Sequence, residues 1–252
     1  MDLATYKEDV WGREVILGAS WDLLWLVVVA AFVIIALHAI VMAVRRRSAK
    51  ASSGGPRIAR HSGIDRIFHW VMTVSVLVLL VTGILPLIGL EFSWLTIHWV
   101  AGLVLTAVVC FHIVRSLFWQ DLKAMWISGR DLKEPFDATL KPGKYSVAQK
   151  GMHAAVTVLV LLVIASGLVM FAMIDTPWWD RSNAIAESTL GWMFLIHGLS
   201  TLALIGLISL HIYFGLRPEK LFYTRSMIKG WISKDELEAH HDPERWAPDK
   251  SS

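Results

Sequence analysis

The stretch TIHWVAGLVLTAVVCFHIVRS, residues 96–116, has a counterpart in LIHGLSTLALIGLISLHIYFG, residues 195–215. Each stretch is strongly apolar and contains two histidines fourteen residues apart, His98 with His112 and His197 with His211. In an α-helix fourteen residues rise about 21 Å and complete nearly four turns, so both histidines of a pair lie on one face, one toward each side of a bilayer. Because a histidine in hydrocarbon is costly and usually functional, the pattern predicts two helices that hold two cofactors across a membrane.

The composition agrees with a membrane setting. The chain has 252 residues, of which 55% are hydrophobic and 13 are Trp, and its mean hydropathy is +0.53. About 20 apolar residues suffice to cross a hydrocarbon core of about 30 Å. Five runs are long enough: residues 21–44, 67–90, 94–119, 152–174 and 190–216. We therefore expect an all-α integral membrane protein, a four-helix bundle with one extra N-terminal transmembrane helix.

The positive residues indicate the orientation of these helices. Lys and Arg number two before the first run, seven in the next loop, none in the following turn, six in the loop 120–151, one in the loop 175–189 and seven after residue 216. Cytoplasmic loops carry the excess of Lys and Arg. We expect a multi-pass protein of the bacterial inner (cytoplasmic) membrane, with its N-terminus outside and its C-terminus in the cytoplasm. Since the charges follow topology, the net charge of +3 does not indicate nucleic-acid binding.

The first run predicts an anchor and not a cleaved secretory signal, because its apolar core is too long and three arginines follow it, at 45–47. The expected organisation is residues 1–56 for an outside segment, the anchor 21–44 and a basic linker, 57–218 for the four-span domain, and 219–252 for a cytoplasmic tail. Ser233 and Glu236 form a capping-box pattern for a short helix in this tail. His240 and His241, in the same charged tail, are expected to be solvated.

Depth along the spans sorts the histidines into two groups. His98 and His197 both lie near the outer face, and His211 lies near the inner face. His211 has three candidate partners at that depth, at positions 69, 112 and 153. A low-spin haem that only passes electrons has both axial positions filled, and neutral imidazole is a suitable ligand. The histidines therefore favour two haem sites.

The single cysteine, Cys110, limits the other redox chemistry of the chain. It excludes an internal disulfide, a cysteine-rich iron–sulfur site and a C-x-x-C-H haem attachment. Any haem is then held non-covalently, and any iron–sulfur cluster belongs to a partner.

Glycines and cations near the histidines allow two interpretations each. Five glycines interrupt the apolar helices, at positions 83, 102, 167, 206 and 215. They either make room for a planar cofactor or let helices approach one another. Four cations, Arg60, Arg66, Arg115 and Arg217, either pair with haem propionates or are topology signals with snorkelling side chains.

At this point the chain resembles a known family. The segments 63–70 (GIDRIFHW), 97–102 (IHWVAG) and 143–150 (GKYSVAQK), with the helix that carries His197 and His211, resemble the γ-subunit of respiratory formate dehydrogenase. That subunit is a four-helix di-haem cytochrome b, and related subunits serve thiosulfate reductases and Ni-hydrogenases. The resemblance covers residues 60–218, and the GKY-x-x-x-QK loop and the order of the histidines are its most specific parts.

The resemblance implies the haem ligands. His98 with His197 would bind the iron of the outer haem, and His69 with His211 that of the inner haem. Spacing alone favours His112 over His69, as in the cytochrome b of quinol–cytochrome c oxidoreductases. His112 therefore stays an alternative inner ligand.

The resemblance also implies a site for quinone or menaquinone beside the inner haem. Candidate residues are Ser146, Ala148, His153 and His211. At positions 146 and 148 the family has Asn and Gly. Serine donates from a shorter side chain than asparagine, and alanine restricts the approach of the backbone. The quinone site is thus where this chain departs from the family pattern.

The function implied is that of a membrane cytochrome b subunit in a respiratory oxidoreductase complex. It would pass electrons through two b-type haems between the quinone pool and partner iron–sulfur and catalytic subunits, the latter of the molybdenum-containing kind. The chain is then an electron-transfer subunit and not a stand-alone enzyme. Three alternatives stay open: a free-standing cytochrome b that exchanges electrons between quinol and a small redox carrier, a proton transporter that uses intramembrane histidines, and a structural anchor for a peripheral complex.

Overall fold

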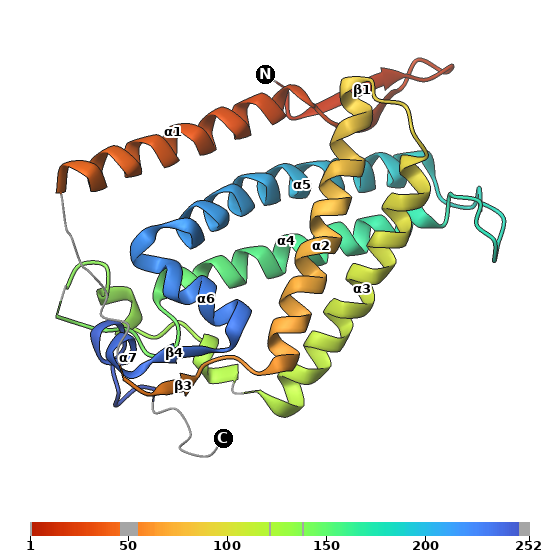
Figure 1. The fold of residues 1–252 in the computed structure, drawn as a ribbon. Helices are drawn as coiled ribbons and strands as arrows, with labels where there is room; N and C mark the ends of the chain where they lie inside the picture. Colours follow the sequence, from red (N-terminus) through yellow and green to blue (C-terminus); the bar gives the residue numbers. More distant parts are fainter. Residues whose placement is uncertain (1, 46–54, 121, 138, 247–252) are drawn as a thin grey trace. The chain divides into compact units, whose positions relative to one another are not determined.

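The structure is a computed structural model and describes residues 2–45, 55–120, 122–137 and 139–246 (Figure 1). Five long helices dominate it: α1 (Asp22–Arg45), α2 (Gly63–Ile84), α3 (Trp94–Trp119), α4 (Val147–Phe171) and α5 (Glu187–Leu216). Each is long and apolar enough to cross a membrane. In hydrocarbon a helix satisfies its own backbone hydrogen bonds, which is why such apolar runs are helical. The five predicted spans are confirmed.

Local signals set the ends of these helices. Pro86 follows α2 in the short 3₁₀ helix η1 (Leu85–Ile88), which Gly89 closes with a left-handed φ of 84°. Helix α4 begins at Val147, five residues before the predicted start. The reason is a capping interaction: the side chain of Gln149 accepts the backbone N–H of Ser146 at 3.0 Å, and Ser146 Oγ accepts the N–H of Gln149 at 3.4 Å. This S-x-x-Q pattern is visible in the sequence.

Contacts divide the chain into two compact units, and each contains parts of the long helices. Unit 1 consists of Met1–Val41, Val78–Gly102 and Ala155–Leu210, and unit 2 of Met42–Leu77, Leu103–Ala154 and His211–Ser252. Unit 1 thus contains His98 and His197, and unit 2 contains the other intramembrane histidines of α2 to α5. The division into residues 1–56, 57–218 and 219–252 stays a prediction.

Unit 1 begins with a β-hairpin that the sequence did not indicate. Strand β1 (Ala4–Glu8) pairs antiparallel with β2 (Glu14–Ala19), with Ala4 opposite Ala19, Glu8 opposite Glu14 and a shift of register between Thr5 and Tyr6. The Asp9 carboxylate closes the turn, because it accepts the backbone N–H groups of Trp11 and Arg13 at 2.9 Å. The hairpin leads directly into α1 (Figure 1).

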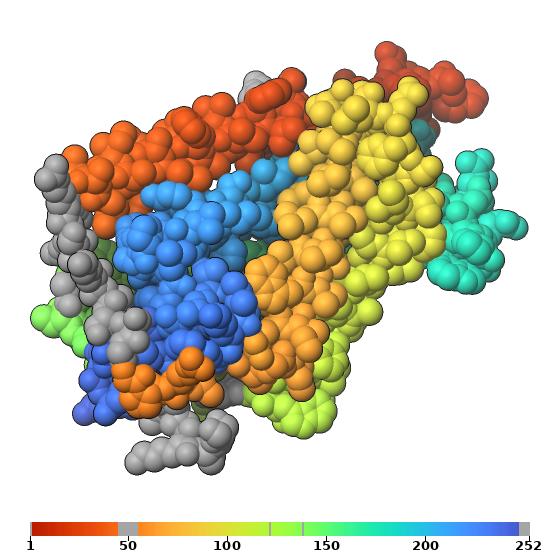
Figure 2. Space-filling model, in the orientation of Figure 1, coloured from red at the N-terminus to blue at the C-terminus, as the bar shows by residue number. Residues whose placement is uncertain are grey.

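A line of glycines on α5 receives this N-terminal part. Gly191 lies against the Ile16 carbonyl of β2, a Cβ on Gly198 would be 2.7 Å from Ala19 Cβ, and one on Gly206 would be 3.4 Å from Val27 of α1. Without a hydrophobic force between helices in lipid, such small residues permit close packing. The first span therefore packs on α5. Its other side is exposed (Figure 2), with Trp25 71% and Phe32 70% accessible.

In unit 2 the C-terminal residues fold back onto residues before α2. Strand β3 (Arg57–Ala59) pairs antiparallel with β4 (Trp231–Ser233), and the short helices α6 (Leu221–Lys229) and α7 (Lys234–His240) flank β4. Phe222, Ile232 and Leu237 form a buried cluster there. The predicted capping box of Ser233 and Glu236 is confirmed at the start of α7.

The remaining short elements of unit 2 are 3₁₀ helices. They are η2 (Leu122–Met125) and η3 (Asp131–Lys133) between α3 and α4, and η4 (Pro218–Lys220) after α5.

Replacing Gly191 by Ala is expected to weaken the packing of the hairpin against α5. The added Cβ would overlap the carbonyl oxygen of Ile16, which belongs to the backbone and cannot turn aside. Overpacking of this kind lowers the free energy of unfolding by about 1–3 kcal/mol. Thermal unfolding in detergent measures the change. Gly151→Ala is the matched control, because a Cβ there meets no atom within 4 Å; equal melting temperatures for the two variants would contradict the packing described.

Candidate functional site

Two histidine rings face each other in unit 1. His98 on α3 and His197 on α5 have ring centres 6.2 Å apart, with 59° between the ring planes. His98 Nδ1 lies 2.8 Å from Thr82 Oγ1, and His197 Nδ1 lies 3.1 Å from Ser166 Oγ. Both hydroxyl groups are buried, and they come from α2 and α4.

The hydroxyl groups determine which ring nitrogen carries the proton. Thr82 donates its single hydroxyl hydrogen to the carbonyl of Val78, and Ser166 donates to that of Leu162. Each hydroxyl can then only accept from the histidine, so Nδ1 of His98 and of His197 carries the hydrogen. This leaves a lone pair on Nε2 of both rings, which is the form that binds a metal ion.

A glycine follows each of these hydroxyl residues along its helix. A Cβ on Gly83 would lie 3.7 Å from Cε1 of His98, and one on Gly167 would lie 3.4 Å from Cε1 of His197. In both dipeptides, Thr82–Gly83 and Ser166–Gly167, the first residue therefore bonds Nδ1 of a ring and the second leaves space beside that ring. Sequence reasoning noticed the glycines and missed the hydroxyls. The recurrence of a hydroxyl residue before glycine in two spans is the signal that could have indicated them.

The other glycines have different neighbours. A Cβ on Gly102 would meet Leu79, and one on Gly215 would meet Thr224. Gly206 contacts α1, as described above. Close approach of helices thus applies to Gly206, whereas room for a planar cofactor beside Gly83 and Gly167 stays a prediction.

A second histidine pair lies in unit 2. His69 on α2 and His211 on α5 have ring centres 6.4 Å apart, with 46° between the planes. Nδ1 of His69 is buried and has no hydrogen-bond partner among the described residues. A buried ring nitrogen without a partner is costly. It therefore fits a ring that binds a group absent from the polypeptide.

Unit 2 holds a third pair, His112 on α3 and His153 on α4, whose ring centres are also 6.4 Å apart. The ring of His112 stacks on Phe68 at 4.1 Å, and its Nε2 lies 3.4 Å from Ser116 Oγ. Because Ser116 donates to Gln120, it accepts from His112, so this Nε2 carries a hydrogen. The structure thus brings His211 to His69, and His112 to His153.

By ring separation the first two pairs fit iron bound by two imidazoles, and so does the third pair, which differs in that Phe68 stacks on the ring of His112. Metal–imidazole bonds are about 2.0–2.1 Å long and each ring centre lies about 1.1 Å beyond its nitrogen, so the two ring centres should be about 6.3 Å apart. The measured distances are 6.2 and 6.4 Å. Among the described residues no group of three or more His, Cys, Asp or Glu could hold a metal ion. Two imidazoles are too few for a free ion, but they complete an iron that a porphyrin already binds.

Each of the four candidate propionate partners contacts other protein groups. Arg60 donates to His241 Nε2 at 3.0 Å and to the Lys144 carbonyl at 2.7 Å. Arg66 donates to the carbonyl of Ile228, Arg115 pairs with Asp65, and Arg217 pairs with Glu219. A role for these cations toward haem propionates stays a prediction.

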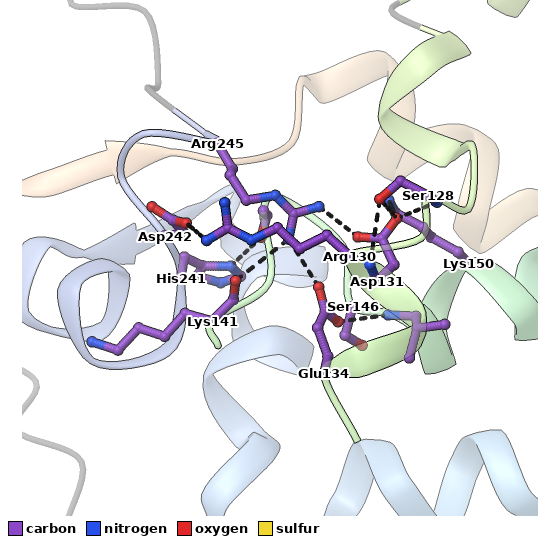
Figure 3. Close-up of polar contacts among 12 residues, drawn as sticks. Ser128, Arg130, Asp131, Glu134, Lys141, Ser146, Lys150, His241, Asp242 and Arg245 are labelled. Atoms are coloured by element: carbon purple, nitrogen blue, oxygen red, sulfur yellow. Dashed lines mark hydrogen bonds and ion pairs between the residues drawn. The ribbon is translucent and has the colours of Figure 1, made fainter. Parts of the chain in front are cut away.

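The loop 143–150, where a quinone site is expected, is held by a buried ionic network (Figure 3). Asp131 is fully buried and accepts from Lys150 Nζ at 2.8 Å, from Ser128 and from Arg245. Burial opposes its ionisation, but the hydrogen bonds from Lys150 and Arg245 outweigh burial and hold the pKa of Asp131 well below its usual range. No sequence motif links Asp131 to Arg245, which lies 114 residues away.

His241 was expected to be solvated, and that expectation is wrong. Its side chain is fully buried, its Nδ1 bonds to the Gly143 carbonyl at 2.6 Å, and its Nε2 faces Arg60. Burial and the neighbouring charge of Arg60 lower the pKa of His241 to about 4, so the ring is neutral near pH 7. Burial and the charges of Arg60 and Lys144 also lower the pKa of His61, to about 3.

Comparisons with known proteins add the relationships of the chain. Residues 60–230 match the prokaryotic cytochrome b561 family. The chain is similar to the formate dehydrogenase cytochrome b556 subunit of Haemophilus influenzae, with 24% identity over 214 residues that cover 77% of this chain and 84% of that protein. It is also similar to the formate dehydrogenase cytochrome b556(fdo) subunit of Escherichia coli K12, with 22% identity over 211 residues, 75% of this chain and 91% of that protein.

The lowered pKa of His241 predicts an acid-sensitive C-terminal fold. The unfolded chain takes up a proton at this histidine near pH 6.5, whereas the folded chain does so only near pH 4. The contribution of the neutral ring to stability is therefore complete above pH 6.5 and is lost as the pH falls toward 4. We expect residues 231–246 to be about 1 kcal/mol less protected at pH 5.5 than at pH 7.5.

Hydrogen exchange, corrected for the intrinsic rate, measures this protection. His241→Gln is expected to lower it at both pH values and to reduce its pH dependence, leaving the share that His61 contributes. A variant with the wild-type pH dependence would show that His241 is not the group responsible.

Proposed function

We propose, since this chain belongs to the prokaryotic cytochrome b561 family, that it binds two b-type haems, one between His98 and His197 and one between His69 and His211. The observation that carries the proposal is the geometry of these pairs, at 6.2 and 6.4 Å between ring centres. A haem bound there supplies an iron that accepts and releases one electron. The family implies b-type haem, and the number of haems is the part proposed here.

The residues around the rings support electron transfer without oxygen chemistry. If each of the two histidine pairs held a haem, the bound group would supply electron transfer and would leave no place for oxygen to bind. Thr82 and Ser166 fix the ring orientation in unit 1 and hold the hydrogen on Nδ1, which raises the basicity of Nε2. Gly83 and Gly167 leave space beside the rings that a side chain would fill.

The relatives indicate the setting of this activity. Both are cytochrome subunits of formate dehydrogenases by name. We propose that this chain is the membrane subunit of a formate dehydrogenase-like respiratory complex in the bacterial cytoplasmic membrane, with its N-terminus outside. Catalytic and iron–sulfur partner subunits would exchange electrons with the unit 1 haem, and quinone with the unit 2 haem. Copurification of an iron–sulfur subunit with the tagged chain separates this role from that of a free-standing cytochrome.

The proposed quinone site lies at the loop 143–150 and the start of α4. Ser146 uses its backbone N–H and its hydroxyl in the cap of α4 with Gln149, so its first role is to begin the helix. His153, four residues after Gln149 on α4, supplies a ring polar enough to bond a quinone oxygen. Ala148 and His211 complete the candidate residues, the latter as a ligand of the nearer haem.

The purified chain is expected to contain two b-type haems, counted by pyridine haemochrome. His98→Ala and His69→Ala should each lose one haem, because an iron with one imidazole is held weakly. His112→Ala should retain both, since His112 faces His153. A wild-type chain with a single haem would contradict the proposal. Loss of haem from His112→Ala, with both retained in His69→Ala, would transfer the inner ligand to His112.

Ser166→Ala tests the hydroxyl that orients His197. Without an acceptor for the hydrogen on Nδ1, the ring loses its fixed orientation, and we expect haem affinity to fall about 10–100-fold. The rate of haem transfer to excess apomyoglobin measures this loss. Ser75→Ala is the matched control, because Ser75 is also buried and donates to the carbonyl four residues before it. If both variants release haem at the same rate, the hydroxyl of Ser166 has no such role.

A further inference from the structure

The C-terminal residues 241–245 lie beyond the part of the chain that matches the family, which ends at residue 230. They nevertheless contact the loop 143–150 directly. His241 Nδ1 donates to the carbonyl of Gly143 at 2.6 Å, and the backbone N–H of Asp242 donates to the carbonyl of Pro142 at 2.8 Å. A Cβ on Gly143 would lie 3.5 Å from the Cβ and the carbonyl oxygen of Arg245. The first residues of the loop therefore lie against the backbone of the tail.

Arg60 extends this contact to the next loop residue. One guanidinium nitrogen donates to His241 Nε2 at 3.0 Å, and the other donates to the Lys144 carbonyl at 2.7 Å. The ring of Tyr223 lies 4.7 Å from the Arg60 guanidinium and that of Trp246 lies 5.1 Å from it. Two successive loop carbonyls, at 143 and 144, are thus held by one buried histidine–arginine pair.

Arg245 acts at the other end of the loop. It pairs with Asp131 and, at 2.9 Å, with Glu134 (Figure 3). Each of these carboxylates also holds a residue of the early α4 helix: Glu134 accepts the backbone N–H of Val147 at 3.1 Å, and Asp131 accepts from Lys150 Nζ at 2.8 Å. The tail therefore reaches Val147 and Lys150 through two acids that it also binds.

Charge and burial make the residues of this network depend on one another. Asp131 and Glu134 balance Lys150 and Arg245, and the side chains of the two acids are 0% and 7% exposed. If Arg245 is removed, two buried carboxylates share one cation, which is unfavourable. Because both carboxylates hold α4, the loss of Arg245 releases the loop as well as the tail.

We propose that His241 and Arg245 are positioning residues that set the affinity of the loop 143–150 for quinone. This inference rests on the proposed function, in which that loop forms the quinone site. The tail fixes the loop at Gly143 and Lys144 through His241 and Arg60, and at Val147 and Lys150 through Arg245 and the two acids. Neither His241 nor Arg245 needs to touch quinone for this role.

The experiment uses the full haem-loaded chain in detergent, reduced with dithionite, separated from the excess reductant by anaerobic desalting, and then mixed with menadione as the quinone. The rate of haem oxidation against menadione concentration gives the half-saturating concentration, here written KM, and the maximal rate, here written kcat. Arg245→Gln is expected to raise KM about tenfold and to change kcat less than twofold, with both haems and their spectra unchanged. Arg245→Lys, which keeps the charge, should recover part of the affinity.

Arg130→Gln is the matched control. It removes an ion pair with the side chain of Asp242, at 2.8 Å, whereas Asp242 reaches the chain beside the loop through its backbone N–H, at Pro142. Its KM is expected to equal that of the wild type. His241→Phe is the second variant, because it keeps a ring of similar size and removes the bond to Gly143. It should also raise KM. If Arg245→Gln does not retain haem, the KM of His241→Phe tests the positioning role in its place.

The outcomes separate this inference from the proposed function. A haem-loaded wild type that menadione does not oxidise overturns the proposed function. A wild type that reacts, with an unchanged KM in a haem-loaded Arg245→Gln or His241→Phe variant, overturns the positioning role alone. An equal rise of KM in Arg130→Gln would also overturn it, because the effect would then follow from any loss of tail contacts.

Discussion

A histidine ring inside an apolar helix bundle has two nitrogens to satisfy, and the arrangement of unit 1 follows from that constraint. One nitrogen of each ring bonds a hydroxyl, from Thr82 or Ser166, that has already given its hydrogen to its own helix. The other nitrogen, Nε2, is left with a lone pair. Helices α2 and α4 thus contribute the acceptor and the adjacent glycine, while α3 and α5 contribute the rings. Four helices thus build the surroundings of the two rings, which is the arrangement that the proposed haem site requires.

The same residue type, glycine, has two uses here because lipid provides no hydrophobic force between helices. Gly83 and Gly167 give room to imidazole rings, whereas Gly191, Gly198 and Gly206 let the hairpin and α1 approach α5. Spacing shows why the second group forms a seam: steps of seven and eight residues return to the same helix face. The extra first span is therefore part of the packed structure of unit 1.

The sequence predicted what depends on local pattern. Apolar length indicated the five spans, the order of the histidines indicated which of them share a depth, and Ser233 with Glu236 indicated the start of α7. It did not predict the hairpin before α1, the burial of His241 or the role of Arg245. Each of these depends on a partner far along the chain, such as Gly191 for Ile16 or Asp131 for Arg245. The early start of α4 was predictable in principle, because the capping pattern of Ser146 and Gln149 is local.

The two-stranded sheet of β3 and β4 has a consequence for the order of biosynthesis. Arg57 pairs with Ser233, and the four helices α2, α3, α4 and α5 all lie between these two residues in the sequence. During translation β3 therefore waits, without its partner strand, until the last span and the residues after it have left the ribosome. Pairings so distant in sequence form late. The sheet can close only on a chain whose every span has been made, and until then β3 keeps an unpaired edge.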